Sequence, residues 1–509
     1  MAGISGHVTD GMSPPYQIAL VAGSWIYLLI GLLWLRRALL SIFNDGMVAV
    51  TLLLLLMGSN LFYMAAFDPL MPHVLLFAIY SGVVWHTIKW NEHGRSRDFY
   101  IVAVLIGVAT IVRFTELILV IIPLLWGLGS PSIGSMRERI KVHRKMYLQG
   151  LVIVAIIFIP QSIYWLIATG QVIYDGYANA GEGLDLHRPH ILEVLFSFRK
   201  GFFIYTPIMA FALVGCIHLY RQARSIVWAV IIFLLVYCWV ASSWTIWWYA
   251  DSFGNRGLLQ SYAIIALPLA SLITYIAQRS RSVKIIWSII VMFFVVLNLF
   301  QTWQVRNGIM HTSQMTKAAY FAVFGRTEKL EHLEDLLVVE RRSDGTIPQM
   351  DPARYRSIAM IEQPLSTPDP EWWTDRYVNE PFNASPMSFR IDAEVPWSPA
   401  VSVKYGAITD AEHLYADYSI HIFFPESAPK PEIILVFGME HDGRQYGVVN
   451  ERIDATGLIP GIWNRVGLRY LTPVIRSPKD KIRGFVWLRS AGPVWVDDGR
   501  MELFEQKEN

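Results

Sequence analysis

The sequence has few charged residues and almost no cysteine. Only 17% of its 509 residues are Asp, Glu, Lys or Arg, whereas 54% are hydrophobic and 19 are Trp. This composition is unusual for a soluble protein and predicts a membrane protein. The two cysteines, Cys216 and Cys238, both fall inside apolar stretches. We therefore interpret them as small hydrophobic residues rather than as a disulfide or a metal-binding pair.

The sequence also lacks the short motifs of common cofactor and metal sites. It contains no Cys-x-x-Cys, no His-Glu-x-x-His, no Walker loop and no dinucleotide fingerprint. The formal net charge is +2, and the positions of the charges are more informative than their sum. We expect no nucleic-acid partner.

Hydrophobic residues are concentrated before Trp303, and the remainder of the chain is polar and strand-like. We predict a membrane domain over residues 1–305, a helical linker over 306–353 and an all-β domain over 354–509. A helix needs ~20 apolar residues to cross a bilayer. About ten candidate membrane segments meet or approach that length: 16–35, 46–66, 71–89, 99–112, 114–128, 147–167, 202–220, 226–246, 259–277 and 284–303.

Cationic residues sort the connecting loops into two groups. Basic loops belong on the cytoplasmic side of a membrane. On this basis the cytoplasmic loops are those carrying Arg36 and Arg37, Arg95 and Arg97, the basic residues of 137–145, Arg221 and Arg224, and the basic residues of 279–284. The loops at 67–70, 168–200 and 247–258 contain less Lys and Arg, so we expect them on the other side.

The segment from residue 98 to 126 begins and ends beside cytoplasmic loops, so it must cross the membrane an even number of times. Its length favours a helical hairpin or re-entrant pair with its apex at 113–116. An arginine at membrane depth must face protein, water or a ligand. Arg113 either closes the apex by pairing with Glu116 or faces a ligand.

The same topology places Met1 outside, although residues 1–15 do not have the pattern of a signal peptide. We therefore expect the chain to lack a first span and a first external loop.

The most informative loop, residues 242–256, combines aromatic and charged side chains at an expected membrane boundary. Trp and Tyr are favoured there because their rings are apolar at one end and polar at the other. This preference does not explain Asp251 and Arg256 beside them. A fixed cation and a carboxylate at the mouth of a helical bundle suit a ligand with a charged head and an apolar tail. The loop therefore indicates lipid-linked chemistry.

Alternating strands separated by turn residues fill the C-terminal part and predict an antiparallel β-sandwich of jelly-roll type. The last run, residues 492–504, resembles the final strands of carbohydrate-binding modules. This likeness concerns the fold, because sugar binding would need exposed aromatic platforms, for which Trp372, Trp373 and Trp397 are weak candidates. A packing or spacer domain is the simpler interpretation. Asp497 and Asp498 form either a calcium site or, more simply, a turn.

Five elements recur in one order: GMSPPYQ (11–17), DPLMPH (68–73), RFTE (113–116), RKGFFIYTP (199–207) and WTIWWYADSFGNR (244–256). Together they resemble bacterial GT-C-type glycosyltransferases, the superfamily of protein O-mannosyltransferases and the aminoarabinose transferase of lipid A. The likeness covers most of residues 11–305. It implies a multi-pass enzyme of the bacterial inner membrane, with its C-terminal domain in the periplasm. Such an enzyme moves a sugar from a polyprenyl-phosphate donor to a lipid, glycan or protein acceptor.

For the donor phosphate of such an enzyme we nominate Arg113, Lys200 and Arg256. Cations there would stabilise the charge that grows on the leaving phosphate. Lys200 could instead extend to the membrane surface from a helix end, and Arg256 could brace the loop by pairing with Asp251. Further substrate-binding candidates are His73, Trp244, Trp248, Tyr249, Asp251 and Asn255.

Acceptor activation needs a general base, which in this superfamily is an acid of the first external loop. The chain has no recognisable counterpart, and Asp68 is the best acid available, unless it only caps a helix. In the loop before Lys200, Asp175, Glu182, Asp185, His187 and His190 match no defined metal site. No cofactor is assigned, and a divalent cation is the one candidate left open.

Two other functions compete with a glycosyltransferase. A truncated relative could bind lipid phosphate without catalysis or serve as an assembly subunit. A transporter or flippase is less favoured, because the spans show no internal repeat and a large external sandwich is unusual for one.

Overall fold

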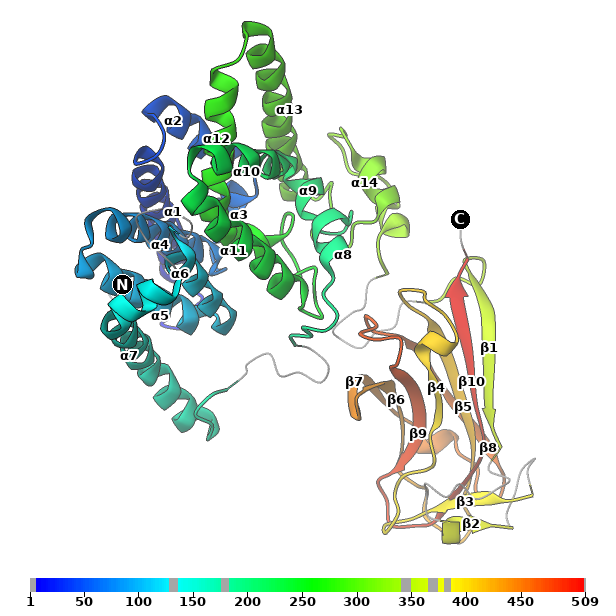
Figure 1. The fold of residues 1–509 in the computed structure, drawn as a ribbon. Helices are drawn as coiled ribbons and strands as arrows, with labels where there is room; N and C mark the ends of the chain where they lie inside the picture. Colours follow the sequence, from blue (N-terminus) through cyan, green and yellow to red (C-terminus); the bar gives the residue numbers. More distant parts are fainter. Residues whose placement is uncertain are drawn as a thin grey trace. The chain divides into compact units, whose positions relative to one another are not determined.

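The computed structural model describes residues 6–127, 136–174, 183–339, 349–364, 374–379 and 386–507. The chain divides into two compact units (Figure 1). The first comprises residues 1–176 and 184–338 and is helical, and the second comprises 177–183 and 339–509 and is rich in β-strands. Residues 306–338, which we assigned to the linker, pack with the helical unit through Met310, Met315 and Tyr320.

The described part of the helical unit follows the predicted apolar segments closely. Its elements are α1 (Pro14–Leu40), α2 (Asp45–Met57), α3 (Leu61–Phe67), α4 (His73–His93), α5 (Ser96–Val112), η1 (Phe114–Val120), α6 (Ile121–Leu125), α7 (Met136–Thr169), α8 (Ile191–Phe196), α9 (Phe202–Tyr205), η2 (Pro207–Met209), α10 (Ala210–Gln222), α11 (Arg224–Ser242), η3 (Arg256–Ser261), α12 (Tyr262–Ala277), α13 (Arg281–Arg306), α14 (Lys317–Val323) and η4 (Leu333–Leu336).

Several of these helices can cross a membrane. Among the described residues, five helical segments are long and apolar enough, and α2 with α3, bent by 58°, makes a sixth if the pair counts as one span. The predicted number of about ten is not confirmed. Helices α5, with 17 residues, and α10, with 13, are shorter than the ~20 residues that a span needs. Helix α4 has 21 residues but is not among the segments that are apolar enough.

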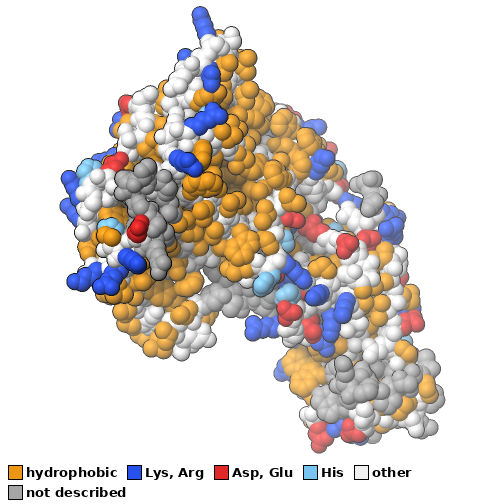
Figure 2. Space-filling model, in the orientation of Figure 1, with side chains coloured by type: hydrophobic (Ala, Val, Ile, Leu, Met, Phe, Trp, Pro, Cys, Tyr) orange, Lys and Arg blue, Asp and Glu red, His pale blue; other side chains and the backbone are white. Residues whose placement is uncertain are grey.

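The surface of the helical unit is strongly apolar. Hydrophobic side chains cover much of the face shown in Figure 2. Large side chains on α7 and α13 are well exposed, among them Ile163, Ile167, Ile289 and Met292. Apolar surface of this extent is costly in water and is the expected surface of a protein in contact with lipid.

The helical path breaks where the apex was expected. Helix α5 ends at Val112, Arg113 has an extended backbone (φ −151°, ψ 125°), and η1 starts at Phe114. The backbone of Arg113 itself remains paired, because its N–H donates to the carbonyl of Ala109 and its carbonyl accepts from the N–H of Glu116, both over 2.9 Å.

The second unit is an antiparallel sandwich. Its described strands are β1 (Tyr355–Gln363), β2 (Tyr377–Val378), β3 (Ser388–Ile391), β4 (Val401–Lys404), β5 (Tyr415–Phe423), β6 (Ile433–His441), β7 (Arg444–Arg452), β8 (Asn464–Leu471), β9 (Lys481–Leu488) and β10 (Val494–Gln506). One sheet has the order β2-β3-β10-β5-β8 with β1 also paired to β10, and the other has the order β4-β9-β6-β7.

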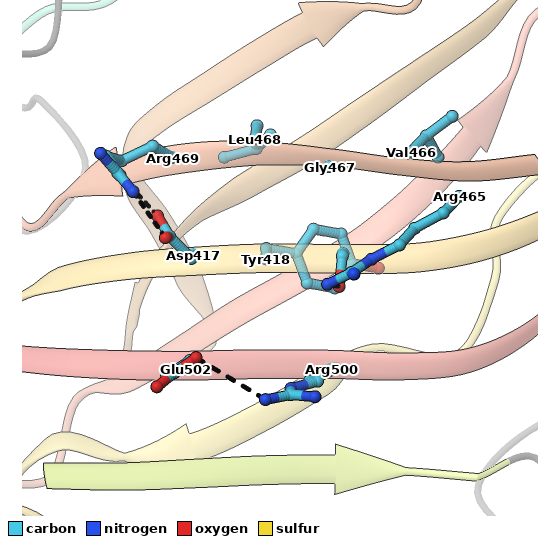
Figure 3. A pocket seen from close by; sticks show the side chains of 10 residues that line it. Asp417, Tyr418, Arg465, Val466, Gly467, Leu468, Arg469, Arg500 and Glu502 are labelled. Carbon is cyan, nitrogen blue, oxygen red and sulfur yellow. Dashed lines mark hydrogen bonds and ion pairs between the residues drawn. The ribbon is translucent and has the colours of Figure 1, made fainter. Parts of the chain in front are cut away.

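Inward side chains of both sheets, including Tyr418, Phe437 and Tyr470, form one core. Polar side chains such as Asp417, Arg469 and Glu502 lie on the outward face of β5, β8 and β10 (Figure 3). This alternation is the pattern from which the sandwich was predicted.

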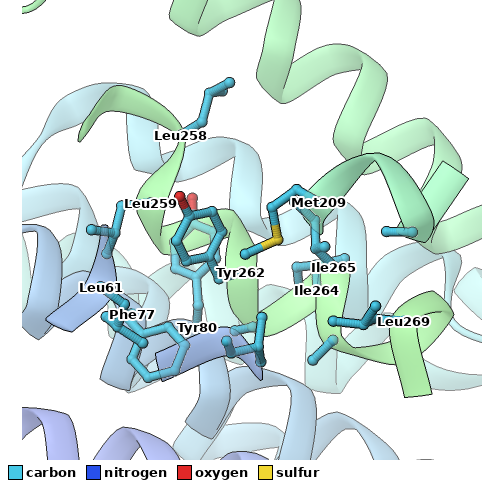
Figure 4. Packing of buried hydrophobic residues seen from close by; sticks show 14 of the residues in the cluster. Leu61, Phe77, Tyr80, Met209, Leu258, Leu259, Tyr262, Ile264, Ile265 and Leu269 are labelled. Atoms are coloured by element: carbon cyan, nitrogen blue, oxygen red, sulfur yellow. The ribbon is translucent and has the colours of Figure 1, made fainter. Parts of the chain in front are cut away.

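Helix α12 lies at the centre of the helical unit. Most of its residues are buried, among them Tyr262, Ala266 and Leu267, which are fully buried. A helix that is apolar on all sides must be surrounded by other elements. Figure 4 shows part of this packing, with Phe77 and Tyr80 of α4 near the start of α12.

A close contact between α10 and α12 depends on Gly215. A Cβ at this position would lie 2.0 Å from the carbonyl oxygen of Pro268, a backbone atom that cannot move away easily. Small residues allow membrane helices to approach this closely.

We predict that Gly215→Ala destabilises the protein by about 1–3 kcal/mol, since the added methyl group overpacks this contact. The matched control is Gly23→Ala in α1, where the nearest atom would be 4.0 Å from the new Cβ. Thermal unfolding in detergent should show a lower Tm for the first variant only. Equal Tm values for the two variants would contradict the packing described.

Candidate functional site

Loops far apart in the sequence meet at one end of the helical unit. Arg256 Nη1 lies 4.0 Å from Asp68 Oδ2, and Lys200 donates hydrogen bonds to Ser252. Thr312 Oγ1 donates to Asp251 Oδ1 over 2.8 Å. We call Asp68, Lys200, Asp251, Asn255 and Arg256 the loop cluster. All five were predicted as site residues, and three expected external loops supply them.

Lys200 is the most unusual member because its charged group is buried. The residue is 1% exposed, and its ammonium donates to the carbonyl oxygen and to Oγ (2.9 Å) of Ser252. The alternative that Lys200 extends to the membrane surface is therefore wrong. Burial, and then the positive charge of Arg256, hold the pKa of Lys200 well below its usual range. A buried ammonium with neutral hydrogen-bond partners is costly, and a bound anion would reduce that cost.

Arg256 lies between two acidic residues. Its guanidinium donates to the backbone carbonyl of Asp251 (3.1 Å), whereas the carboxylate of Asp251 accepts from Thr312. The predicted alternative was a pair between Arg256 and Asp251 that braces the loop. In the structure Arg256 makes this contact with the backbone carbonyl of Asp251. Arg256 also faces the carboxylate of Asp68.

The two carboxylates of the loop cluster differ in their environment. Burial raises the pKa of Asp68, and the charges of Arg256 and Lys200 oppose this shift. Burial also raises the pKa of Asp251, but hydrogen bonds from Ser313 and Thr312 outweigh it and lower the pKa below the usual value. Asp68 is therefore the carboxylate better suited to accept a proton.

Asn255 has a buried side-chain amide without a hydrogen-bond partner. The residue is 2% exposed, and in the described structure neither Nδ2 nor Oδ1 makes a hydrogen bond. Leaving a buried amide unpaired costs on the order of 1–3 kcal/mol. Such a group is expected where a ligand completes the hydrogen bonds.

A second polar group surrounds the break after α5. Glu116 is 1% exposed and accepts hydrogen bonds from Tyr80 and from Gln260 (3.0 Å). Gln260 also contacts His73, with 3.1 Å between Oε1 and Nδ1. The charges of both Arg113 and Arg256 act on His73, so this group adjoins the loop cluster.

Arg113 interacts with Tyr249 and Glu116, among other residues, at this point. Its guanidinium carbon lies 5.8 Å from the centroid of the Tyr249 ring, and its charge acts on Glu116. Both predicted roles for Arg113, closing the apex and facing the site, are compatible with this position.

Residues 242–256 form a loop that we call the Trp-rich loop, in which Trp248 is buried. Tyr249 and Ala250 have left-handed backbones (φ 55° and 52°), a conformation that costs about 1–3 kcal/mol per residue and clusters at functional sites. The ring of Trp248 lies under Arg199, with 3.9 Å between Cζ and the ring centroid. Trp244 forms a backbone bridge with Leu184.

The loop before Lys200 supplies no metal site in the described residues. Asp185 and His190 donate backbone hydrogen bonds to Ser243 and Ser242, while Asp175 and Glu182 lie outside the residues described. No group of three or more His, Cys, Asp or Glu that could hold a metal ion occurs in the described part of the chain.

Sequence reasoning missed the end of α13 and the segment that follows it. The guanidinium of Arg306 lies over the ring of Phe67 (4.7 Å), and its charge acts on Tyr63 together with that of Asp68. Thr312 holds Asp251. The alternation of loops places the end of the last span on the same side of the membrane as residues 247–258. This pattern could have pointed to these residues as part of the site, although we assigned them to a linker.

Residues 16–165 match the family model of dolichyl-phosphate-mannose-protein mannosyltransferases. This match confirms the resemblance read from the motifs over that part of the chain, and the family implies a membrane glycosyltransferase of GT-C type. No curated protein matches the chain. A solved structure, an arabinose-bound α-L-arabinofuranosidase, is similar to part of this chain, with 13% sequence identity and a TM-score of 0.18. The matched part covers 30% of this chain and 23% of the arabinofuranosidase chain. That similarity carries no argument about the fold or the function.

We predict that Asn255→Leu raises the stability of the ligand-free protein by about 1–3 kcal/mol, because it removes an unpaired buried amide. The matched control is Asn60→Leu. The amide of Asn60 is paired with Phe253 (3.0 Å) and Tyr262 (2.6 Å), so its loss should lower stability by a similar amount. The measurement is thermal unfolding in detergent. Destabilisation by both variants would mean that the Asn255 amide already has partners.

Proposed function

We propose that the protein transfers a sugar from a polyprenyl-phosphate donor to an acceptor on the periplasmic face of a bacterial inner membrane. The observation that carries this proposal is the buried ammonium of Lys200, next to Arg256, at one end of an apolar helical bundle. A polyprenyl phosphate has an anionic head for these cations and an apolar tail for the lipid-facing surface. The family match supports the reaction class.

The donor phosphate would bind at Lys200 and Arg256, with Arg113 completing the cationic surroundings from the α5 break. When the bond between the sugar and the phosphate breaks, negative charge grows on the phosphate oxygen. Fixed cations in a poorly hydrated site stabilise this charge more than water does. The same groups hold the donor before reaction, which fixes its orientation.

Asp68 would act as the general base. A hydroxyl of the acceptor loses its proton to the Asp68 carboxylate while its oxygen forms a bond to the anomeric carbon. The bond from that carbon to the phosphate oxygen breaks, and polyprenyl phosphate leaves with the electron pair. The side chain of Asp68 is 22% exposed, so a substrate hydroxyl can reach it.

The remaining candidates would contact the sugar. The unpaired amide of Asn255 offers one donor group and one acceptor, which matches a sugar hydroxyl. His73 and Tyr249 line the side of the site near Arg113, and Asp251 shapes the loop from which Asn255 extends. Trp248 would support the site through Arg199, and Trp244 would act only through the position of the loop.

We predict that Arg256→Ala lowers the rate of sugar transfer by about 10²–10³-fold, the usual cost of removing one group that stabilises a developing negative charge. The matched control is Arg36→Ala, an exposed arginine near the end of α1 that pairs with Asp45 at the start of α2. The assay measures transfer of labelled sugar from a set of polyprenyl-phosphate donors by the purified full chain.

Equal turnover of Arg256→Ala and Arg36→Ala would contradict the site assignment. Binding of polyprenyl phosphate by the wild-type protein without any transfer would instead support the competing function, a relative that binds lipid phosphate without catalysis.

The depressed pKa of Lys200 predicts a link between binding and pH. Because burial and Arg256 lower this pKa, part of the Lys200 population loses its proton as the pH rises towards the usual lysine value. A bound phosphate favours the protonated form and raises the pKa. Binding should therefore take up protons, and affinity should fall as the pH increases.

Titration calorimetry of polyprenyl phosphate in buffers with different ionisation enthalpies measures this proton uptake. Lys200→Met should bind more weakly and with less proton uptake. An affinity that is independent of pH in the wild-type protein would contradict the assignment of Lys200 to the phosphate.

A further inference from the structure

The outward face of the six-stranded sheet in the β-unit contains two adjoining cavities. They have volumes of about 450 Å³ and 260 Å³, and Ser419, Arg465 and Arg500 line both of them. Figure 3 shows the larger cavity, with side chains from β5, β8 and β10 around it. The two cavities form one groove along β5, which we call the sheet groove.

Strand register explains why the face is hollow. Ser419 of β5 lies between Gly467 of β8 and Arg500 of β10. Gly467 has no side chain, so the face is open at this position, whereas side chains occupy the neighbouring positions of the strands. The register of β10 shifts between Asp497 and Arg500, and Asp498 has a left-handed backbone (φ 47°). Bulges of this kind redirect side chains and are common beside binding sites.

The polar side chains of the sheet groove carry both signs of charge. Arg469 donates two hydrogen bonds to the carboxylate of Asp417, at 2.6 and 2.7 Å. Arg500 lies 3.7 Å from Glu502. Arg465 donates to the hydroxyl of Ser419 over 3.2 Å, and none of the ion pairs found among the described residues includes it. The groove therefore offers hydrogen-bond donors and acceptors side by side without a strong net charge.

Aromatic rings continue the same face at one end of the groove. Phe423 lies two residues beyond His421 on β5, and its ring centroid is 5.6 Å from that of Trp463 and 5.9 Å from that of Trp495. All three residues are partly exposed. Along β5, the distance from Asp417 to Phe423 is about 20 Å at ~3.3 Å per residue.

We propose that the sheet groove binds a neutral oligosaccharide. Sugar hydroxyls can accept hydrogen bonds from guanidinium groups and donate them to carboxylates, and the groove contains both groups. The carbon-bound hydrogens of a sugar ring give it an apolar face that can stack on aromatic rings. The carboxylates of Asp417 and Glu502 would repel an anionic ligand. Arg465 and Arg500 would repel a cationic one.

The aromatic residues of this site differ from those considered from the sequence. Trp372 and Trp373 lie outside the described residues. Trp397 forms a bridge with Trp487 of β9, which belongs to the four-stranded sheet. Of the expected weak candidates, the one described, Trp397, thus does not line the sheet groove.

The test uses the full chain in lipid nanodiscs, which carry no sugar headgroups. Neutral linear tetra- to hexasaccharides of glucose, mannose, galactose and arabinose are screened by calorimetry, with oligogalacturonates as anionic comparators. At least one neutral class should bind, and Arg465→Ala should weaken its binding about tenfold, the usual effect of losing a hydrogen bond to a charged group. Ser419→Ala should weaken it by a smaller factor.

The matched control is Arg452→Ala, an exposed arginine of β7 that pairs with Glu432 on the other sheet. This variant and Arg256→Ala should bind the oligosaccharide like the wild-type protein, which separates the sheet groove from the loop cluster. The proposal is overturned if no neutral oligosaccharide binds, if only the anionic ones bind, if Arg465→Ala and Arg452→Ala bind equally well, or if Arg256→Ala abolishes binding.

Discussion

The buried ammonium of Lys200 is the constraint on which the account of this protein depends. Its hydrogen bonds go to neutral oxygens of Ser252. The negative charges of Asp251 and Asp68 offset only part of the cost of burial and of the positive charge of Arg256 nearby. A protein retains such an arrangement at a cost in stability. An anionic ligand that enters the site offsets this cost, so the same interaction links folding, binding and chemistry.

The surrounding helices explain how such a costly site can persist. Helix α12 is buried on all sides, and its contact with α10 at Gly215 leaves little space for movement. Asn60 at the start of α3 accepts from Tyr262 of α12 and donates to the backbone of the Trp-rich loop. This fixed frame supports the left-handed backbones of Tyr249 and Ala250, which would otherwise relax.

Local features of the fold were predictable from the sequence, whereas the contacts that make the site were not. The apolar segments 259–277 and 284–303 place α12 and α13 within a few residues, because apolar composition is a property of one element alone. The helix break at Arg113 follows from the cost of an arginine at membrane depth. The burial of Lys200 and the unpaired amide of Asn255 depend on how distant loops meet, which periodicity does not encode. For the same reason Arg306 and Thr312 were assigned to a linker.

The most direct test of the central claim is an experimental structure of the protein with bound polyprenyl phosphate, determined by electron cryomicroscopy in nanodiscs. The account predicts a phosphate group within hydrogen-bonding distance of Lys200 Nζ and the Arg256 guanidinium, with the isoprenoid chain leading to the apolar surface. A phosphate bound elsewhere, with the Lys200 ammonium still held by Ser252 alone, would contradict it.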